Sequence, residues 1–224
     1  MDGGVYLKMR LRSRLVLLTF LVAALVVGNG LAAASSTFWG PTGLINVPTA
    51  DVQPMDSLEI GLHQANRRGA ITISYGLLDV LEVGMGIFDD RWDDAEFSGF
   101  AKFNLLQETK SAPGVAIGVS ALEDTSYFMV ASKRLDGVGV RGHIGIGKGN
   151  VDGLFAGVSK VLNPVTVSTY QSYWQAPVTT IMGEWDGSAL NLGLELAFTP
   201  NVKLRLEARA MESLGFSLMF ETRL

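Results

Sequence analysis

From residue 57 to the end, apolar and polar residues alternate with a period of two, which is the repeat of a β-strand with two unlike faces. No window of helical length has apolar residues at i, i+3, i+4 and i+7. The alternation predicts about twelve strands, over 57–65, 69–77, 79–88, 95–105, 114–122, 125–133, 138–147, 153–161, 178–185, 188–198, 201–209 and 213–222. Such a high strand content predicts an all-β sandwich or barrel.

The last three predicted strands indicate how neighbouring strands pair. Asp186-Gly187 is typical of a two-residue hairpin turn, so Trp185 is expected opposite Ser188. Three-residue turns at 199–201 and 211–213 then bring apolar residues together on one face and opposite charges on the other. The expected pairs are Phe198–Val202, Leu194–Leu206, Leu206–Leu218, Leu204–Phe220, Glu195–Arg205 and Lys203–Glu221.

Alternation alone leaves open which face points inward. In a soluble sandwich or lipocalin-like barrel the apolar face forms the core, whereas in an outer-membrane barrel it contacts lipid. Three features favour the membrane: strands of about 8 to 11 residues, a final strand that reaches the C-terminus, and aromatic residues near strand ends. These aromatic residues are Tyr75, Phe88, Trp185, Phe198 and Phe220.

The sequence therefore predicts an antiparallel transmembrane β-barrel of about twelve strands, with a soluble β domain as the alternative. The candidate lipid-facing residues are Ile181, Leu190, Leu192, Leu194, Leu196, Val202, Leu204, Leu206, Phe216, Leu218 and Phe220. The candidate lumen-lining residues are Glu59, Glu82, Glu96, Lys102, Arg141, His143, Glu184, Glu195, Lys203, Arg205, Glu207, Arg209, Glu221 and Arg223. Because this lining is nearly balanced in sign, we expect cross-strand ion pairs and a narrow or blocked pore.

The first 34 residues have the three-part layout of a secretory signal peptide. A basic cluster at 8–14 precedes an uncharged apolar run at 15–27, and small residues at 31–34 predict cleavage near Ala34. A helix of thirteen residues rises only about 20 Å, too short for a bilayer core, so cleavage is favoured over an uncleaved anchor. The expected organisation is a signal peptide at 1–34, an N-terminal strap at 35–56 and a barrel at 57–224.

Composition narrows the class of protein further. The 224 residues include no cysteine and only 18% charged residues, which excludes a disulfide scaffold and a highly charged nucleic-acid binder. Beyond residue 34 the chain carries 14 basic and 21 acidic side chains, a net charge of −7. Such an acidic surface repels phosphate backbones, so no nucleic-acid partner is expected.

The segment Phe38-Trp39-Gly40-Pro41-Thr42-Gly43-Leu44-Ile45-Asn46-Val47-Pro48-Thr49-Ala50 is not explained by alternation. It resembles the entry segment of YjbH-type proteins, outer-membrane β-barrels associated with exopolysaccharide production. Glycine-rich strands such as 81–86 and 190–194 also resemble that family. The resemblance implies a single barrel with polysaccharide as a candidate partner. From the residues alone, a turn-rich strap is favoured over a ligand site, because Gly43 permits a tight bend and Pro48 ends strand pairing.

Candidate chemistry in the sequence is sparse. The two histidines, His63 and His143, lie in no H-E-x-x-H spacing, and no G-x-S-x-G elbow or P-loop occurs, so we predict no catalysis, metal or cofactor. A lipid hydrolase using one of these histidines stays an alternative. The acidic turn 89–94 is interpreted as a solvated loop, with a Ca²⁺ or lipopolysaccharide contact as its alternative.

Together these observations predict an exported protein in the outer membrane of a diderm bacterium. Its expected role is structural or accessory, in exopolysaccharide production or export, and the alternative is a narrow passive channel for small solutes. Expected partners are outer-membrane lipid and the barrel assembly machinery. The connection 162–177 is expected on the periplasmic side, unless it hides a further strand.

Overall fold

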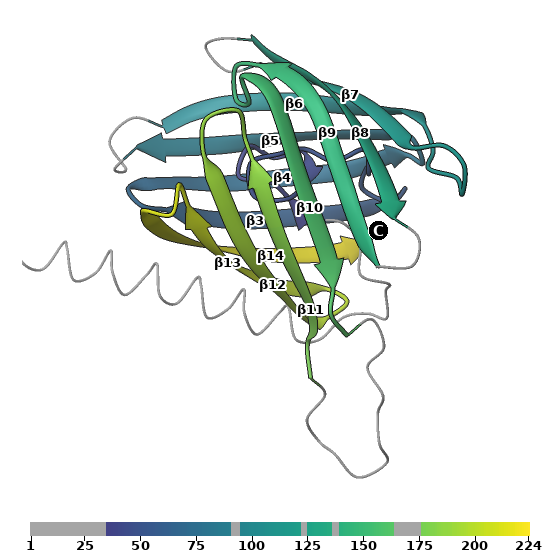
Figure 1. Cartoon of the computed structure of the whole chain (residues 1–224). Coiled ribbons are helices and arrows are strands. Elements are labelled where there is room, and N and C mark those ends of the chain that lie inside the picture. Colours follow the sequence, from purple (N-terminus) through teal and green to yellow (C-terminus); the bar gives the residue numbers. More distant parts are fainter. Residues whose placement is uncertain (1–34, 91–94, 122–124, 136–138, 164–175) are drawn as a thin grey trace, which may run out of the picture.

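The computed structural model describes residues 35–90, 95–121, 125–135, 139–163 and 176–224. Within these ranges, twelve antiparallel strands close into one barrel (Figure 1). They are β3 (Ser57–Ala65), β4 (Arg68–Leu78), β5 (Leu81–Asp90), β6 (Ala95–Leu106), β7 (Gly114–Ala121), β8 (Thr125–Leu135), β9 (Val140–Lys148), β10 (Gly153–Val161), β11 (Val178–Trp185), β12 (Leu190–Thr199), β13 (Val202–Arg209) and β14 (Ser213–Arg223). Two short strands, β1 (Ser35–Ser36) and β2 (Thr42–Gly43), pair separately.

The barrel closes where β14 pairs with β3, from Ser57 opposite Arg223 to Ala65 opposite Gly215. The all-β barrel of twelve strands is confirmed, and the predicted strands agree with the observed ones to within two residues at each end. No helix in the described part of the chain is of a length and apolarity that could cross a membrane. Most of the connection 162–177 lies outside the described residues.

Two predicted registers are wrong by two residues. Trp185 pairs with Leu190 rather than with Ser188, because the Asp186 carboxylate accepts hydrogen bonds from Ser188 and Ala189 and widens the turn to residues 186–189. Similarly, Leu206 pairs with Phe216 and Leu204 with Leu218, because Arg209 pairs with Ser213 and the turn therefore occupies residues 210–212 instead of 211–213. A shift of two residues leaves every side chain on its original face.

The predicted pairs Glu195–Arg205 and Leu194–Leu206 are confirmed. A β-bulge between Ala197 and Thr199 places Val202 opposite Thr199 instead of Phe198. The bulge adds one residue to β12 near its end, so it corrects the register locally and leaves the middle of the pair unchanged.

The barrel wall has an apolar outer face and a polar inner face. Large hydrophobic side chains such as Phe97, Ile144 and Leu154 are more than 60% exposed on the outside. The inward-facing ionic side chains of Lys102 and Arg205 are at most 1% exposed. This arrangement is the inverse of a soluble barrel and is that of a transmembrane β-barrel, in which closure pairs the backbone groups that lipid cannot satisfy.

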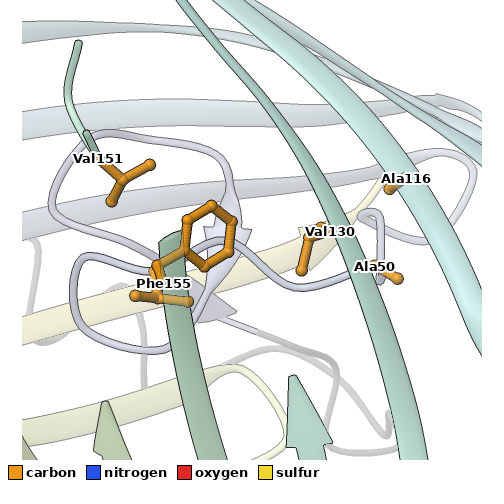
Figure 2. Packing of buried hydrophobic residues seen from close by; sticks show 6 residues of the cluster. Ala50, Ala116, Val130, Val151 and Phe155 are labelled. Carbon is orange, nitrogen blue, oxygen red and sulfur yellow. The ribbon is translucent and has the colours of Figure 1, made fainter. Parts of the chain in front are cut away.

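Residues 35–56, here called the inner segment, lie inside the barrel rather than across its mouth (Figure 1). Val47 and Ala50 pack against Val130, Phe155 and other inward-facing apolar residues. Figure 2 shows Ala50, Val130 and Phe155 of this cluster. Near the rim opposite the termini of the barrel, Phe38 and Trp39 pack against Phe88. Phe88 is therefore buried in the lumen, and its predicted place in an outer aromatic girdle is wrong.

Two glycines permit the close approach of the inner segment to the wall. Gly76 of β4 has no room for a side chain, because a Cβ there would lie 1.9 Å from the carbonyl oxygen of Pro54. Gly40 adopts a φ of 107°, and a Cβ there would lie 2.6 Å from the Phe100 ring. The backbone of the inner segment can therefore bridge to β4, where Met55 pairs with Gly76 in parallel.

The face assignment predicts a depth-dependent cost of outward-facing charge. Leu194→Arg, at the middle of β12, should lower the free energy of unfolding by about 2–4 kcal/mol in lipid, because the cation would lie near the bilayer midplane. Leu214→Arg, at the start of β14, should cost about 0–1 kcal/mol. The measurement is urea unfolding in vesicles, followed by gel mobility. Equal tolerance of both variants would contradict the assignment.

Candidate functional site

The contact between the inner segment and the barrel wall contains most of the buried charge, and Glu184 of β11 is the simplest example. Its carboxylate accepts hydrogen bonds from three successive backbone N–H groups, those of Ile45 (3.0 Å), Asn46 (2.8 Å) and Val47 (3.2 Å). The side-chain amide of Asn191 donates a fourth, at 3.0 Å. Successive N–H groups that converge in this way form an anion-binding concavity, which here holds a carboxylate of the protein itself.

Glu82 and Lys102 form a second anchor on neighbouring strands. They lie opposite each other in the β5–β6 register, and their charged atoms are 3.2 Å apart with neither side chain exposed. Glu82 accepts from Thr42 through both its N–H (2.8 Å) and its hydroxyl (2.5 Å), and also from the N–H of Gln53 (3.2 Å). Lys102 donates to the Thr42 carbonyl at 2.7 Å. The ion pair is therefore completed by backbone groups of the inner segment.

A third anchor holds the beginning of the inner segment. Glu59 of β3 accepts from the Ser36 N–H at 2.7 Å, while Arg205 of β13 donates to the carbonyl oxygens of Ser36 (3.0 Å) and Leu44. Arg205 also forms an ion pair with Glu195, at 2.7 Å. The guanidinium thus links two carbonyls to one carboxylate inside the barrel, which uses its planar set of donors.

At the rim that carries the chain's C-terminus, Arg141 of β9 forms ion pairs with Asp51 and, at 2.9 Å, with Glu108. Burial raises the pKa of Asp51, but the charge and hydrogen bond of Arg141 outweigh it, and the pKa is lowered overall. Next to this pair, Ala50 donates its N–H to Ser132 Oγ at 2.9 Å. The anchors therefore involve strands on opposite sides of the barrel.

The structure places the fourteen predicted lumen residues in three groups. Those in contact with the inner segment are Glu59, Glu82, Lys102, Arg141, Glu184, Glu195, Arg205 and Arg209. Those bonded to other wall residues are His143, Lys203, Glu207 and Glu221. Glu96 and Arg223 are exposed at strand ends and are not brought into the site. The eleven predicted lipid-facing residues are each exposed or half-buried.

Several polar residues of the site were missed in the sequence. Ser74 and Ser132 bond to the inner segment, and each alternates in step with charged residues on its strand or its neighbour. The same alternation could have found them, had uncharged polar residues been counted. Asp51 and Asn46 lie in the aperiodic inner segment, where alternation gives no signal.

Both histidines have their two ring nitrogens next to hydroxyl groups. His63 contacts Ser217 (2.8 Å) and Thr72 (3.0 Å), and His143 contacts Ser132 (2.8 Å) and Ser159 (3.4 Å). Ser217 donates its own proton to Glu207 at 2.7 Å, which differs from a nucleophilic serine that donates to its histidine.

No group of three His, Cys, Asp or Glu residues that could hold a metal ion is found among the described residues. The acidic turn at 91–94 lies outside them. A small recess of about 20 Å³ lies at the rim opposite the termini of the barrel and is lined among others by Trp39, Asn46, Pro48 and Asn150.

A family model described as "Exopolysaccharide biosynthesis protein YbjH" matches residues 35–207, which include the inner segment and most of the barrel. The chain belongs to the YjbH family. The resemblance carried by residues 38–50 is thereby confirmed. No curated protein matches the chain.

Solved structures similar to this YjbH-family chain are outer-membrane barrels. The Acinetobacter baumannii outer membrane protein Omp33 is 9% identical, with a TM-score of 0.45, and the match covers 75% of this chain and 97% of that one. The N-terminal β-barrel domain of Pseudomonas aeruginosa OprF is 16% identical, with a TM-score of 0.23, and the match covers 76% of this chain and all of that one.

Loss of the Glu184 charge should release the middle of the inner segment. Glu184→Gln keeps the side-chain shape but replaces one acceptor oxygen by an amide that faces N–H donors, so we expect a loss of about 2–3 kcal/mol. The measurement is the temperature of the heat-modifiable gel shift, together with protease cleavage within residues 35–56. Glu96→Gln, at an exposed strand end, is the matched control and should change neither. Unchanged protection in Glu184→Gln would contradict the anchor.

The Asp51–Arg141 pair predicts a loss of stability in acid. Because the folded-state pKa of Asp51 lies below its ordinary value of 3.8, its contribution is complete above that pH and is lost as the pH falls through the folded-state pKa. The difference in thermal midpoint between the unaltered protein and Asp51→Asn should therefore be constant near neutral pH and shrink below pH 3.8. A difference that grows in acid would contradict the lowered pKa.

Proposed function

We propose that this YjbH-family protein is a non-catalytic barrel of the outer membrane with an accessory role in exopolysaccharide production or export. The family match supports the polysaccharide context. The observation that carries the accessory role is the position of the inner segment, which occupies the barrel interior and is bonded to inward-facing residues of eight strands. A barrel filled in this way is better suited to a structural or attachment role than to free diffusion of solutes.

The apolar outer face supports residence in a lipid bilayer, and the leader-like residues 1–34 support export to the outer membrane of a diderm bacterium. On this proposal the partners are outer-membrane lipid and the barrel assembly machinery that inserts it. Polysaccharide is the proposed ligand, and the recess that contains Trp39 offers aromatic and amide groups at the rim opposite the termini of the barrel.

A gene deletion with complementation tests this role. The deletion should lower surface polysaccharide while uptake of small hydrophilic solutes stays unchanged, and the unaltered gene should restore the polysaccharide. The matched complementation uses Glu184→Gln and Glu96→Gln, of which only the former should fail or restore it in part. Reduced solute uptake with normal polysaccharide would replace the accessory role by that of a passive channel.

Conductance tests the filled interior directly. In a planar bilayer the purified protein should conduct little, because the inner segment occupies the lumen, whereas a chain that keeps residues 1–34 but lacks residues 35–56 should conduct measurably. The double variant Glu82→Gln, Glu184→Gln gives a second test, since it weakens two anchors without shortening the chain. High conductance of the unaltered protein would contradict the proposal.

A further inference from the structure

The inner segment begins deep within the barrel. Ser35 and Ser36 are at most 3% exposed, and Ser35 pairs with Gly43 of β2. The side chain of Ser35 lies next to the carboxylate of Glu195, in the middle of β12. The Ser36 N–H is already bonded to Glu59. The backbone at Ser35 therefore lies among ionic groups of the wall.

The wall that faces β1 consists of β3, β12, β13 and β14, and its described, non-exposed ionic residues are unequal in number. Four carboxylates face three basic groups, namely Glu59, Glu195, Glu207 and Glu221 against Lys203, Arg205 and Arg209. They form three sets of ion pairs, Lys203 with Glu59 and Glu221, Arg205 with Glu195, and Arg209 with Glu207, with separations from 2.7 to 3.8 Å. Burial of an ionised carboxylate costs free energy unless a positive charge or several hydrogen bonds compensate it.

One carboxylate oxygen of this wall has no direct hydrogen bond among the described residues. It is Oε2 of Glu59, which lies 3.8 Å from Lys203, and the hydroxyl of Ser35 is also buried without such a partner. One further positive charge with several donors, located at Ser35, would balance the wall and complete its hydrogen bonding.

We propose that a signal peptidase cleaves between Ala34 and Ser35, and that the α-ammonium group thereby created stays inside the barrel as the counter-ion of Glu195 and Glu59. The enzyme adds water across the Ala34–Ser35 amide bond. The hydroxyl goes to the carbonyl carbon of Ala34, and the Ser35 nitrogen leaves as an amine that takes up a proton.

An α-amino group ordinarily has a pKa of about 7.7–8.0, so it is charged at neutral pH and more so next to carboxylates. It offers three donors, where the uncleaved amide nitrogen offers one and no charge. Cleavage at this bond thus supplies the missing charge.

The test uses the full-length gene, with the protein isolated from outer membranes. Its intact mass should correspond to a chain that starts at Ser35. An amine-acetylating reagent, followed by peptide mapping, should modify the Ser35 α-amine about 100-fold more slowly in the folded protein than after boiling in detergent. The exposed Lys110 serves as the internal reference and should react quickly in both states. A different N-terminus, or an α-amine as reactive as Lys110, would overturn the proposal.

A second variant separates the new charge from the wall. Insertion of Ser-Gly directly after Ala34 moves the α-ammonium away from Glu195, so its acetylation should approach the rate of Lys110, and the temperature of the heat-modifiable shift should fall. The matched control has the same insertion between Ser111 and Ala112, in an exposed connection, and should retain a slow α-amine. Protection of the α-amine in both variants would overturn the proposal. If the extended chain does not assemble, the acetylation rate of the Ser35 α-amine in the unaltered protein is by itself the test of the proposal.

Discussion

The constraint on which the structure depends is the absence of hydrogen-bonding partners in hydrocarbon. A wall with an apolar outer face must turn the ionic side chains in the middle of its strands inward, as Lys102 and Arg205 illustrate. A twelve-stranded lumen is wider than one that wall side chains fill by themselves. The inner segment supplies what is missing, because its peptide groups are donors and acceptors without net charge. Glu184, which binds three of its N–H groups, therefore stays compensated without a basic partner on the described strands.

The fold could be predicted from the sequence because its main signal is local. Side chains on a strand alternate by geometry, so inward residues such as Glu195 and Arg205 are separated from outward ones without knowledge of the partners. The pairing register between neighbouring strands was harder to predict than the strands themselves. The length of the turn after Trp185 depends on which N–H groups the Asp186 side chain binds. The resulting register error of two residues left every side chain on the face that was predicted for it. Phe88 shows the limit of the pattern, because an aromatic residue near a strand end fits a girdle and a filled lumen equally well.

Only the barrel-wall part of the candidate site could be predicted from the sequence. The wall residues follow from alternation, but their partners are up to 169 positions away in the chain, as for Arg205 and Ser36, and lie in a segment with no repeat. The residues that carry the family resemblance have identifiable physical roles. Thr42 binds Glu82 through two donors, and a Cβ on Gly43 would lie 2.3 Å from the carbonyl oxygen of Val47. These roles are the bends and contacts of a segment folded within a barrel, which a strap across the mouth would not require.

The arrangement of the anchors also determines how the inner segment could move. Glu82 binds both Thr42 and Gln53, so one carboxylate connects the two halves of the segment. Arg205 connects Ser36 with Leu44 in the same way. Displacement of one part therefore exposes a buried charge that also holds another part, and an uncompensated buried charge costs more than the bond that was broken. Release of the segment should thus be concerted, and a partly displaced segment should be scarce, because each remaining anchor would keep its charge without its full set of partners.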